Sequence, residues 1–150
     1  MRAINFLLGI LAALLVAAAL GAIWSLTGLA GSGRASWFAP LAAVVLALVL
    51  RFNNHAPGGL RALVCTLLLA LTAAHANYLM AAGFIAGQMG LELLDALRII
   101  GLDMAYSVAR AHTDRGDAIA YGIALVLALL LGFRQPGELA SKGQPKRRKS

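Results

Sequence analysis

The residues most suited to chemistry in this sequence interrupt a long apolar stretch, which reads LTAAHANYLMAAG over residues 71–83. His75 and Asn77 stand there among alanines and leucines. A polar side chain at membrane depth is costly unless it is paired or hydrated, so we expect both to point into the protein interior. With Thr72 and Tyr78 they form the candidate polar positions within the membrane.

Helical geometry separates the histidine from the asparagine. Since successive residues of an α-helix turn by about 100°, His75 and Asn77 point about 200° apart and face different neighbours. We expect each to make an interhelical hydrogen bond, worth on the order of 0.6 kcal/mol on average. The functional alternative is a polar path for a proton or solute, lined by His75 and Asn77.

The sequence predicts no cofactor and no metal. A haem held by two histidines needs a second histidine within the membrane, but His55 lies in a turn and His112 lies in a polar connection. A set made of His75, His112 and Asp103 or Asp114 has none of the spacings typical of zinc sites. A haem- or quinone-binding redox subunit is therefore the weakest alternative.

Enzymatic motifs are also missing from the sequence. It contains no serine-histidine-acid pattern, no HExxH motif and no phosphate-binding glycine loop. The apolar stretches carry no carboxylate, although ion-coupled transporters usually keep acidic or basic residues inside their spans. With a single cysteine, Cys65, an intramolecular disulfide is impossible. We predict a protein that is not an enzyme.

These positions are held by apolar segments that indicate a membrane protein. The chain is 61% hydrophobic and 13% charged, whereas soluble domains are about 25% charged. Four continuous apolar runs stand out, at residues 4–26, 35–52, 60–83 and 118–133. About 20 helical residues cross a hydrocarbon layer about 30 Å thick, so the second and fourth runs are near the minimum. We predict an all-α integral membrane bundle of four transmembrane helices over residues 1–134.

The distribution of basic residues predicts the orientation. The links after the first two runs are short, so successive spans are antiparallel neighbours. The apolar core of residues 4–26 is longer than that of a signal peptide, which favours an uncleaved anchor. Nine of the 13 Lys and Arg residues then lie on one side: Arg2, Arg51, Arg61, Arg134, Lys142, Lys146, Arg147, Arg148 and Lys149. The positive-inside rule predicts a bacterial inner-membrane protein with both termini in the cytoplasm.

The connection at residues 84–117 would then face outward. It favours an amphipathic helix over residues 91–111, bent or broken at Gly101, with an apolar face of Leu94, Leu97, either Ile100 or Gly101, Met104 and Val108. This helix could lie on the membrane surface, dock a partner or cover a polar cavity. The candidate outer interaction face consists of Glu92, Asp95, Arg98, Asp103 and Arg110.

Small residues recur every four positions in three of the runs, and such spacing permits close backbone approach between helices in lipid. These predicted packing seams are Gly9, Ala13, Ala17 and Gly21, then Ala39, Ala43 and Ala47, and finally Ala120, Ala124, Ala128 and Gly132. Aromatic residues prefer the membrane interface, so we expect five of them to anchor the outer side: Trp24, Trp37, Phe38, Tyr78 and Tyr121.

The C-terminal residues 135–150 predict a disordered basic cytoplasmic tail, because they include two prolines and almost no apolar side chain. Its cluster of Lys146, Arg147, Arg148 and Lys149 could contact anionic lipid or act as a topological signal, and we expect no nucleic-acid binding.

The leading hypothesis is a non-catalytic accessory, assembly or immunity-type subunit that binds the lipid bilayer and either another membrane protein or its own copies. The alternative is a small oligomeric transporter or channel.

Overall fold

The computed structural model describes residues 2–31, 35–53 and 58–133, and the regular structure of these ranges is α-helical throughout. The predicted all-α fold class is therefore confirmed for the part of the chain described. Its six helices are α1 (Arg2–Ala30), α2 (Phe38–Phe52), α3 (Gly59–Met89), α4 (Leu93–Ile99), α5 (Leu102–His112) and α6 (Arg115–Phe133). The basic tail, with its cluster at residues 146–149, lies outside the described residues.

Three of the described helices, and not the four predicted, are long and apolar enough to cross a membrane. They are α1, α3 and α6. Helix α2 has 15 residues, which cover about 22 Å, less than the hydrocarbon thickness of about 30 Å. It is shorter than predicted because residues 35–37 form a turn, in which the Phe38 amide donates to the Ala35 carbonyl at 2.9 Å.

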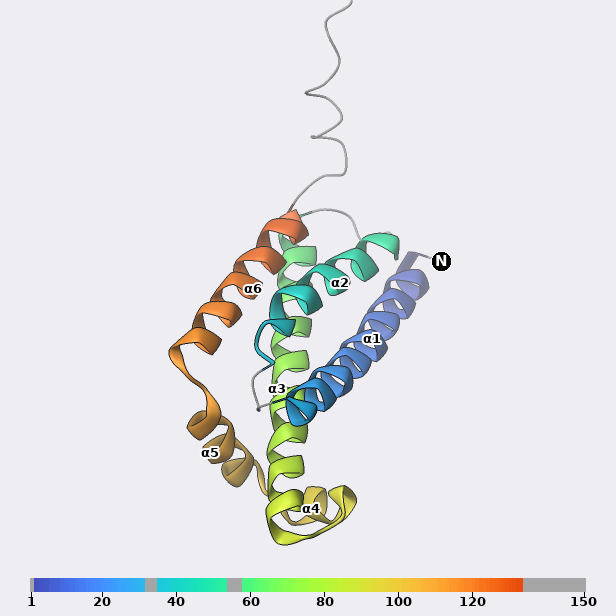
Figure 1. Cartoon of the computed structure of the whole chain (residues 1–150). Helices are drawn as coiled ribbons and strands as arrows, with labels where there is room; N and C mark the ends of the chain where they lie inside the picture. Colours follow the sequence, from blue (N-terminus) through green and yellow to red (C-terminus); the bar gives the residue numbers. More distant parts are fainter. Residues whose placement is uncertain (1, 32–34, 54–57, 134–150) are drawn as a thin grey trace, which may run out of the picture.

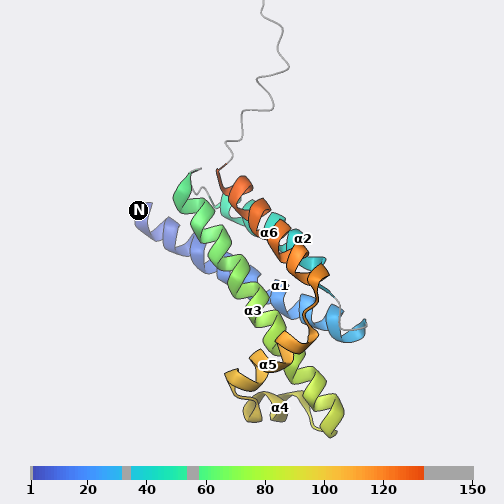
Figure 2. The ribbon, with the colours of Figure 1, turned by 90° about the vertical axis from the view of Figure 1, so that its left-hand side faces the viewer.

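Helix α3 lies at the centre of the structure and packs against all five other described helices (Figure 1). Helices α2 and α6 pack against its first two thirds, α1 packs against its middle and reaches Gly83, and α4 and α5 lie against its second half, as Figure 2 also shows. The start of α3 and the end of α6 meet at one end of the molecule, where the Gly58 amide approaches the Gly132 carbonyl at 3.5 Å. The chain thus passes through the bundle in alternating directions.

The predicted packing seams are buried. In α1, Ala13 and Ala17 are fully covered, as are Ala39 and Ala43 in α2 and Ala124 and Ala128 in α6. Large apolar side chains on the opposite faces point outward, for example Leu15 of α1 and Leu67 of α3. The bundle is therefore held by close approach of small residues, with large apolar side chains on its outer surface.

The closest of these approaches joins α3 and α6. A methyl group added at Gly132 would collide with the Cα and Cβ atoms of Ala62. Beside this contact the buried side chain of Arg61 reaches across, donating from Nε to the Gly132 carbonyl at 2.9 Å and from an Nη to the Leu131 carbonyl at 3.2 Å. The guanidinium thereby satisfies carbonyls at the end of α6 that have no partner within their helix.

Helix α3 is longer than the span predicted for it. It continues through Gly83, the predicted end, to Met89, and it stops at Gly90, whose φ of 66° is a left-handed conformation that favours glycine. Its 31 residues extend about 46 Å, well beyond the hydrocarbon thickness. We call α4, α5 and residues 81–86 of α3 the distal layer, which has an apolar core of its own.

The segment predicted as one amphipathic helix forms two. The predicted break at Gly101 is confirmed, since Ile100 and Gly101 both have extended backbone between α4 and α5. The predicted apolar face is partly wrong, because Leu94 and Met104 are exposed whereas Ala96 and Ala105 are buried. Because Ile100 and Gly101 are extended, the side chains of α5 start at a different angle from those of α4. One apolar stripe therefore cannot continue from α4 into α5.

Candidate functional site

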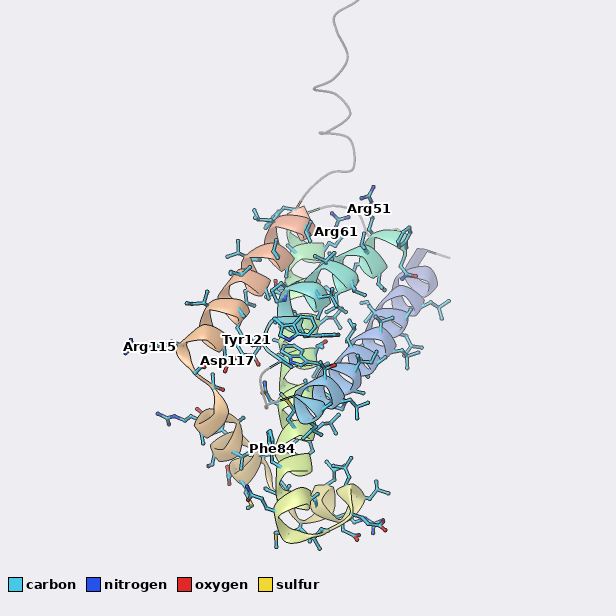
Figure 3. The ribbon with its side chains drawn as sticks, viewed as in Figure 1. Arg51, Arg61, Phe84, Arg115, Asp117 and Tyr121 are labelled. Atoms are coloured by element: carbon cyan, nitrogen blue, oxygen red, sulfur yellow. The ribbon has the colours of Figure 1, made fainter. Side chains whose placement is uncertain are left out.

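Asn77 makes the contact that was expected of an intramembrane polar residue. Its amide nitrogen donates to the Tyr121 hydroxyl at 3.1 Å and to the Ala73 carbonyl at 2.9 Å. The first of these bonds joins α3 to α6. Tyr121, which points toward the molecule's interior in Figure 3, is thereby fixed beside the aromatic residues of two further helices.

Those aromatic residues are Trp24 of α1 and Phe38 of α2. The ring centroids of Trp24 and Tyr121 lie 5.8 Å apart, and those of Trp24 and Phe38 lie 5.9 Å apart, both within the range for favourable aromatic pairs. We call Trp24, Phe38, Asn77 and Tyr121 the aromatic node. It joins α1, α2, α3 and α6 through side chains.

The aromatic node corrects the prediction that Trp24 and Phe38 anchor the outer interface. Trp24 is 0% exposed, whereas the neighbouring Trp37 is 61% exposed. Trp24 follows Ala17 and Gly21 on the buried stripe of α1. That helical spacing is the sequence signal that could have placed it inside.

A small cavity of about 30 Å³ adjoins the aromatic node. Its lining includes Trp24, Asn77 and Tyr121 together with Thr113 and Asp117 from the start of α6 and the preceding turn. Within the described part of the chain the indole N–H of Trp24 is buried with no hydrogen-bond partner. The cavity is large enough for one water molecule, which could accept the indole proton.

Asp117 reaches this cavity from a helix cap. The Asp114 amide donates to a carboxylate oxygen of Asp117 at 2.9 Å, and the Asp117 amide donates to Asp114 at 3.0 Å. This reciprocal pair is the capping-box arrangement, with two acidic groups placed at the positive end of the helix dipole. The two carboxylates therefore stabilise the start of α6, where Figure 3 shows Asp117 on the inner side and Arg115 on the outer side.

His75 lies apart from the aromatic node, on the α1 side of α3. A methyl group at Gly21 would approach the His75 ring carbon Cδ2 to 2.6 Å, so the imidazole packs against the α1 backbone. It lines a hollow of about 170 Å³ with Leu14, Ala17 and Thr72, among others. The structure records no hydrogen bond from His75 to the residues described, and the Thr72 hydroxyl donates within α3 to the Leu68 carbonyl. The two hollows share no lining residue.

Tyr78 connects the membrane helices to the distal layer. Its hydroxyl lies 3.2 Å from the Leu97 carbonyl and 3.3 Å from the Ile100 carbonyl. These are the carbonyls at the end of α4 and at the break that follows. Tyr78 therefore holds that break against α3.

An open groove of about 650 Å³ runs between α3 and α5. Tyr78 and Asn77 line it from α3, and Leu102, Tyr106 and Arg110 line it from α5. Small residues leave this space open: Ala74, Ala105 and Ala109. Asn77 is thus part of both the groove and the small cavity.

The predicted outer interaction face is divided between α4 and α5. Glu92, Asp95 and Arg98 lie at α4, and Asp103 and Arg110 lie on α5; all five are exposed. Asp95 and Arg98 form an ion pair at 3.8 Å, although such an exposed pair contributes little to stability. The five residues do not converge on one site.

Metal-binding sets of three or more His, Cys, Asp or Glu side chains are not found among the described residues. The residue that sequence reasoning missed is Arg61, which was counted only as a topological charge. Nothing near Arg61 in the sequence indicates that it would reach a helix end 70 residues later.

The chain matches no protein-family description, no curated protein and no solved structure in the three comparisons made. Its function is therefore argued from the arrangement of its own residues.

Proposed function

We propose that the protein is a non-catalytic, multi-pass membrane subunit of the accessory, assembly or immunity type. It docks onto a larger membrane protein through its distal layer. Two features support this: Asn77, Tyr78 and Tyr121 form hydrogen bonds with one another or with the backbone, and the distal layer is an ordered platform on a helix that extends past the bundle.

The observation that carries the proposal is the outward face of α4. Ala96 and Ile100 pack inward against α3, whereas Leu94 is 66% exposed and Ile99 is 65% exposed. We call Glu92, Leu94, Asp95, Arg98 and Ile99 the α4 face. Large apolar residues held on an ordered element, with charges around them, are typical of a protein interaction surface.

The proposed setting is the bacterial inner membrane, with both termini in the cytoplasm. Arg51 and Arg61 lie at the end of the bundle opposite the distal layer (Figure 3), and the positive-inside rule favours the cytoplasm for that end. The α4 face is then presented on the periplasmic side, where it can meet an outer domain of a membrane partner.

Co-purification of the full chain from mild detergent tests the docking function. Replacing Leu94 and Ile99 together by alanine should remove a stoichiometric partner, because it removes most of the exposed apolar surface of the α4 face. The matched control is Ile123→Ala on the lipid-facing side of α6, where the side chain is also half exposed. It should leave the partner bound.

Photo-crosslinking gives the same test within the intact membrane. A photoreactive residue at position 94 should form one discrete protein adduct, whereas one at position 126, on the exposed side of α6, should label lipid. The docking function is rejected if position 94 also labels lipid alone and the native protein purifies without a partner.

A further inference from the structure

We propose that the groove between α3 and α5 binds the phosphate headgroup of an anionic phospholipid, whose acyl chain lies along the exposed side of α3. This proposal is independent of docking through the α4 face, which is formed by other residues.

The α5 side of the groove changes in polarity along its length. Leu102, Tyr106 and Arg110 are four residues apart, so they lie in one row along the helix. The row passes from a fully apolar side chain through a phenol to a guanidinium. Arg110 is the member of this row nearest the start of α6, and Leu102 is the member nearest α4.

Arg110 supplies the charge that a phosphate would need. It is exposed, and the structure records no ion pair between it and the other residues described. The exposed Tyr106 hydroxyl, one turn away, is a second donor. Arginine binds phosphate through two parallel hydrogen bonds, which makes it the preferred residue for this group.

The position of the groove along α3 fits a lipid headgroup. Ala74, Asn77 and Tyr78 lie 15 to 19 residues after the first residue of α3. At 1.5 Å per residue, this places them about 22–29 Å along the helix, at the edge of a hydrocarbon layer about 30 Å thick. The groove therefore begins where headgroups replace acyl chains.

An exposed stripe on α3 leads to the same place. Leu63, Leu67, Ala70 and Ala74 are all exposed and follow one another at spacings of three or four residues, which puts them on one side of the helix. Ala74 is also part of the groove lining. An acyl chain packed along this stripe brings its phosphate directly to Arg110.

Native mass spectrometry of the full chain, released from detergent, tests the site. The probes are phosphatidylglycerol and phosphatidylcholine with identical acyl chains. We expect one retained phosphatidylglycerol, with about fivefold higher occupancy than phosphatidylcholine, which is the preference that one basic residue gives near an anionic headgroup. Arg110→Ala should abolish the preference. The control Arg98→Ala removes another exposed arginine, the one paired with Asp95 on α4, and should leave the preference unchanged.

A second variant tests whether the groove itself is used. Ala74→Trp fills its membrane end without changing any charge and should lower the retention of both lipids severalfold, while circular dichroism shows a folded protein. Equal occupancy of the two lipids in the native protein overturns the proposal. So does an equal effect of the two arginine variants, or full retention in Ala74→Trp, because lipid would then be attracted by general surface charge.

Discussion

The contact between Gly132 and Ala62 makes the sharpest prediction about how this bundle is held together. Gly132→Ala adds one methyl group where α6 crosses the start of α3. The new Cβ would lie 2.7 Å from the Ala62 Cβ and 2.9 Å from the Ala62 backbone nitrogen, and closer still to its Cα. Carbon atoms in contact normally lie about 3.5–4.0 Å apart. Since the clash involves the backbone of α3, no side-chain rotation relieves it and the helices must separate by about 1 Å.

The expected loss of stability has three parts. Overpacking of this kind costs about 1–3 kcal/mol. Separation of the helices also lengthens the bonds from Arg61 to the end of α6, and hydrogen bonds to charged groups contribute about 1.5–3 kcal/mol. Alanine has a helix propensity about 1 kcal/mol better than glycine, which offsets part of the loss. We expect the free energy of unfolding to fall by about 3 kcal/mol.

The measurement is reversible unfolding in mixed micelles of increasing denaturing-detergent content. Tryptophan fluorescence reports on the transition, because Trp24 is buried in the aromatic node and becomes exposed on unfolding, whereas Trp37 is already exposed. The control is Gly122→Ala in the same helix, where an added methyl group meets no described atom within 4 Å; its stability should stay equal or rise by up to about 1 kcal/mol. Gly132→Ala with native stability would refute the close contact between α3 and α6.

Two further predictions concern side chains that join helices. Arg61→Leu removes the hydrogen bonds to the Leu131 and Gly132 carbonyls and should lower the free energy of unfolding by about 2 kcal/mol in the same titration. Arg61→Lys should recover only part of this stability, because an ammonium group cannot reproduce the planar fork of a guanidinium. Unchanged stability in the leucine variant would exclude the capping role. A double-mutant cycle of Asn77→Ala and Tyr121→Phe should give a coupling energy of about 0.6 kcal/mol, and at most about 2. Additive effects of these two substitutions would mean that their hydrogen bond contributes nothing.

The sequence alone determined those features that depend only on residues close to one another along the chain. Helical spacing placed Ala13 and Ala17 on one side of α1, and the structure buries both. The same reasoning predicted a break at Gly101, where the chain does leave the helix. Both results follow because side-chain direction and backbone freedom are set locally, within a turn or two of the chain.

Apolar composition by itself could not decide how long each helix is. Residues 35–37 stand at the start of the predicted second apolar run, but they form the turn before α2 and leave that helix too short to be a fourth crossing. Conversely, α3 continues through Gly83 because the Leu29 side chain of α1 occupies the space beside it and the distal layer packs around its last third. The packing of neighbouring elements, more than the apolar composition of each segment, sets where these helices begin and end.

The partners of the polar residues were decided by tertiary structure. His75 and Asn77 looked alike in the sequence, yet Asn77 binds Tyr121, 44 residues away, while His75 packs against Gly21. Arg61 finds the carbonyl of Gly132, 71 residues away, although its neighbours in the sequence suggest only a solvated charge. Hydrogen bonds act over about 3 Å. Which polar groups meet therefore depends on how α3 is rotated about its axis relative to α1 and α6. The local sequence pattern does not determine this rotation.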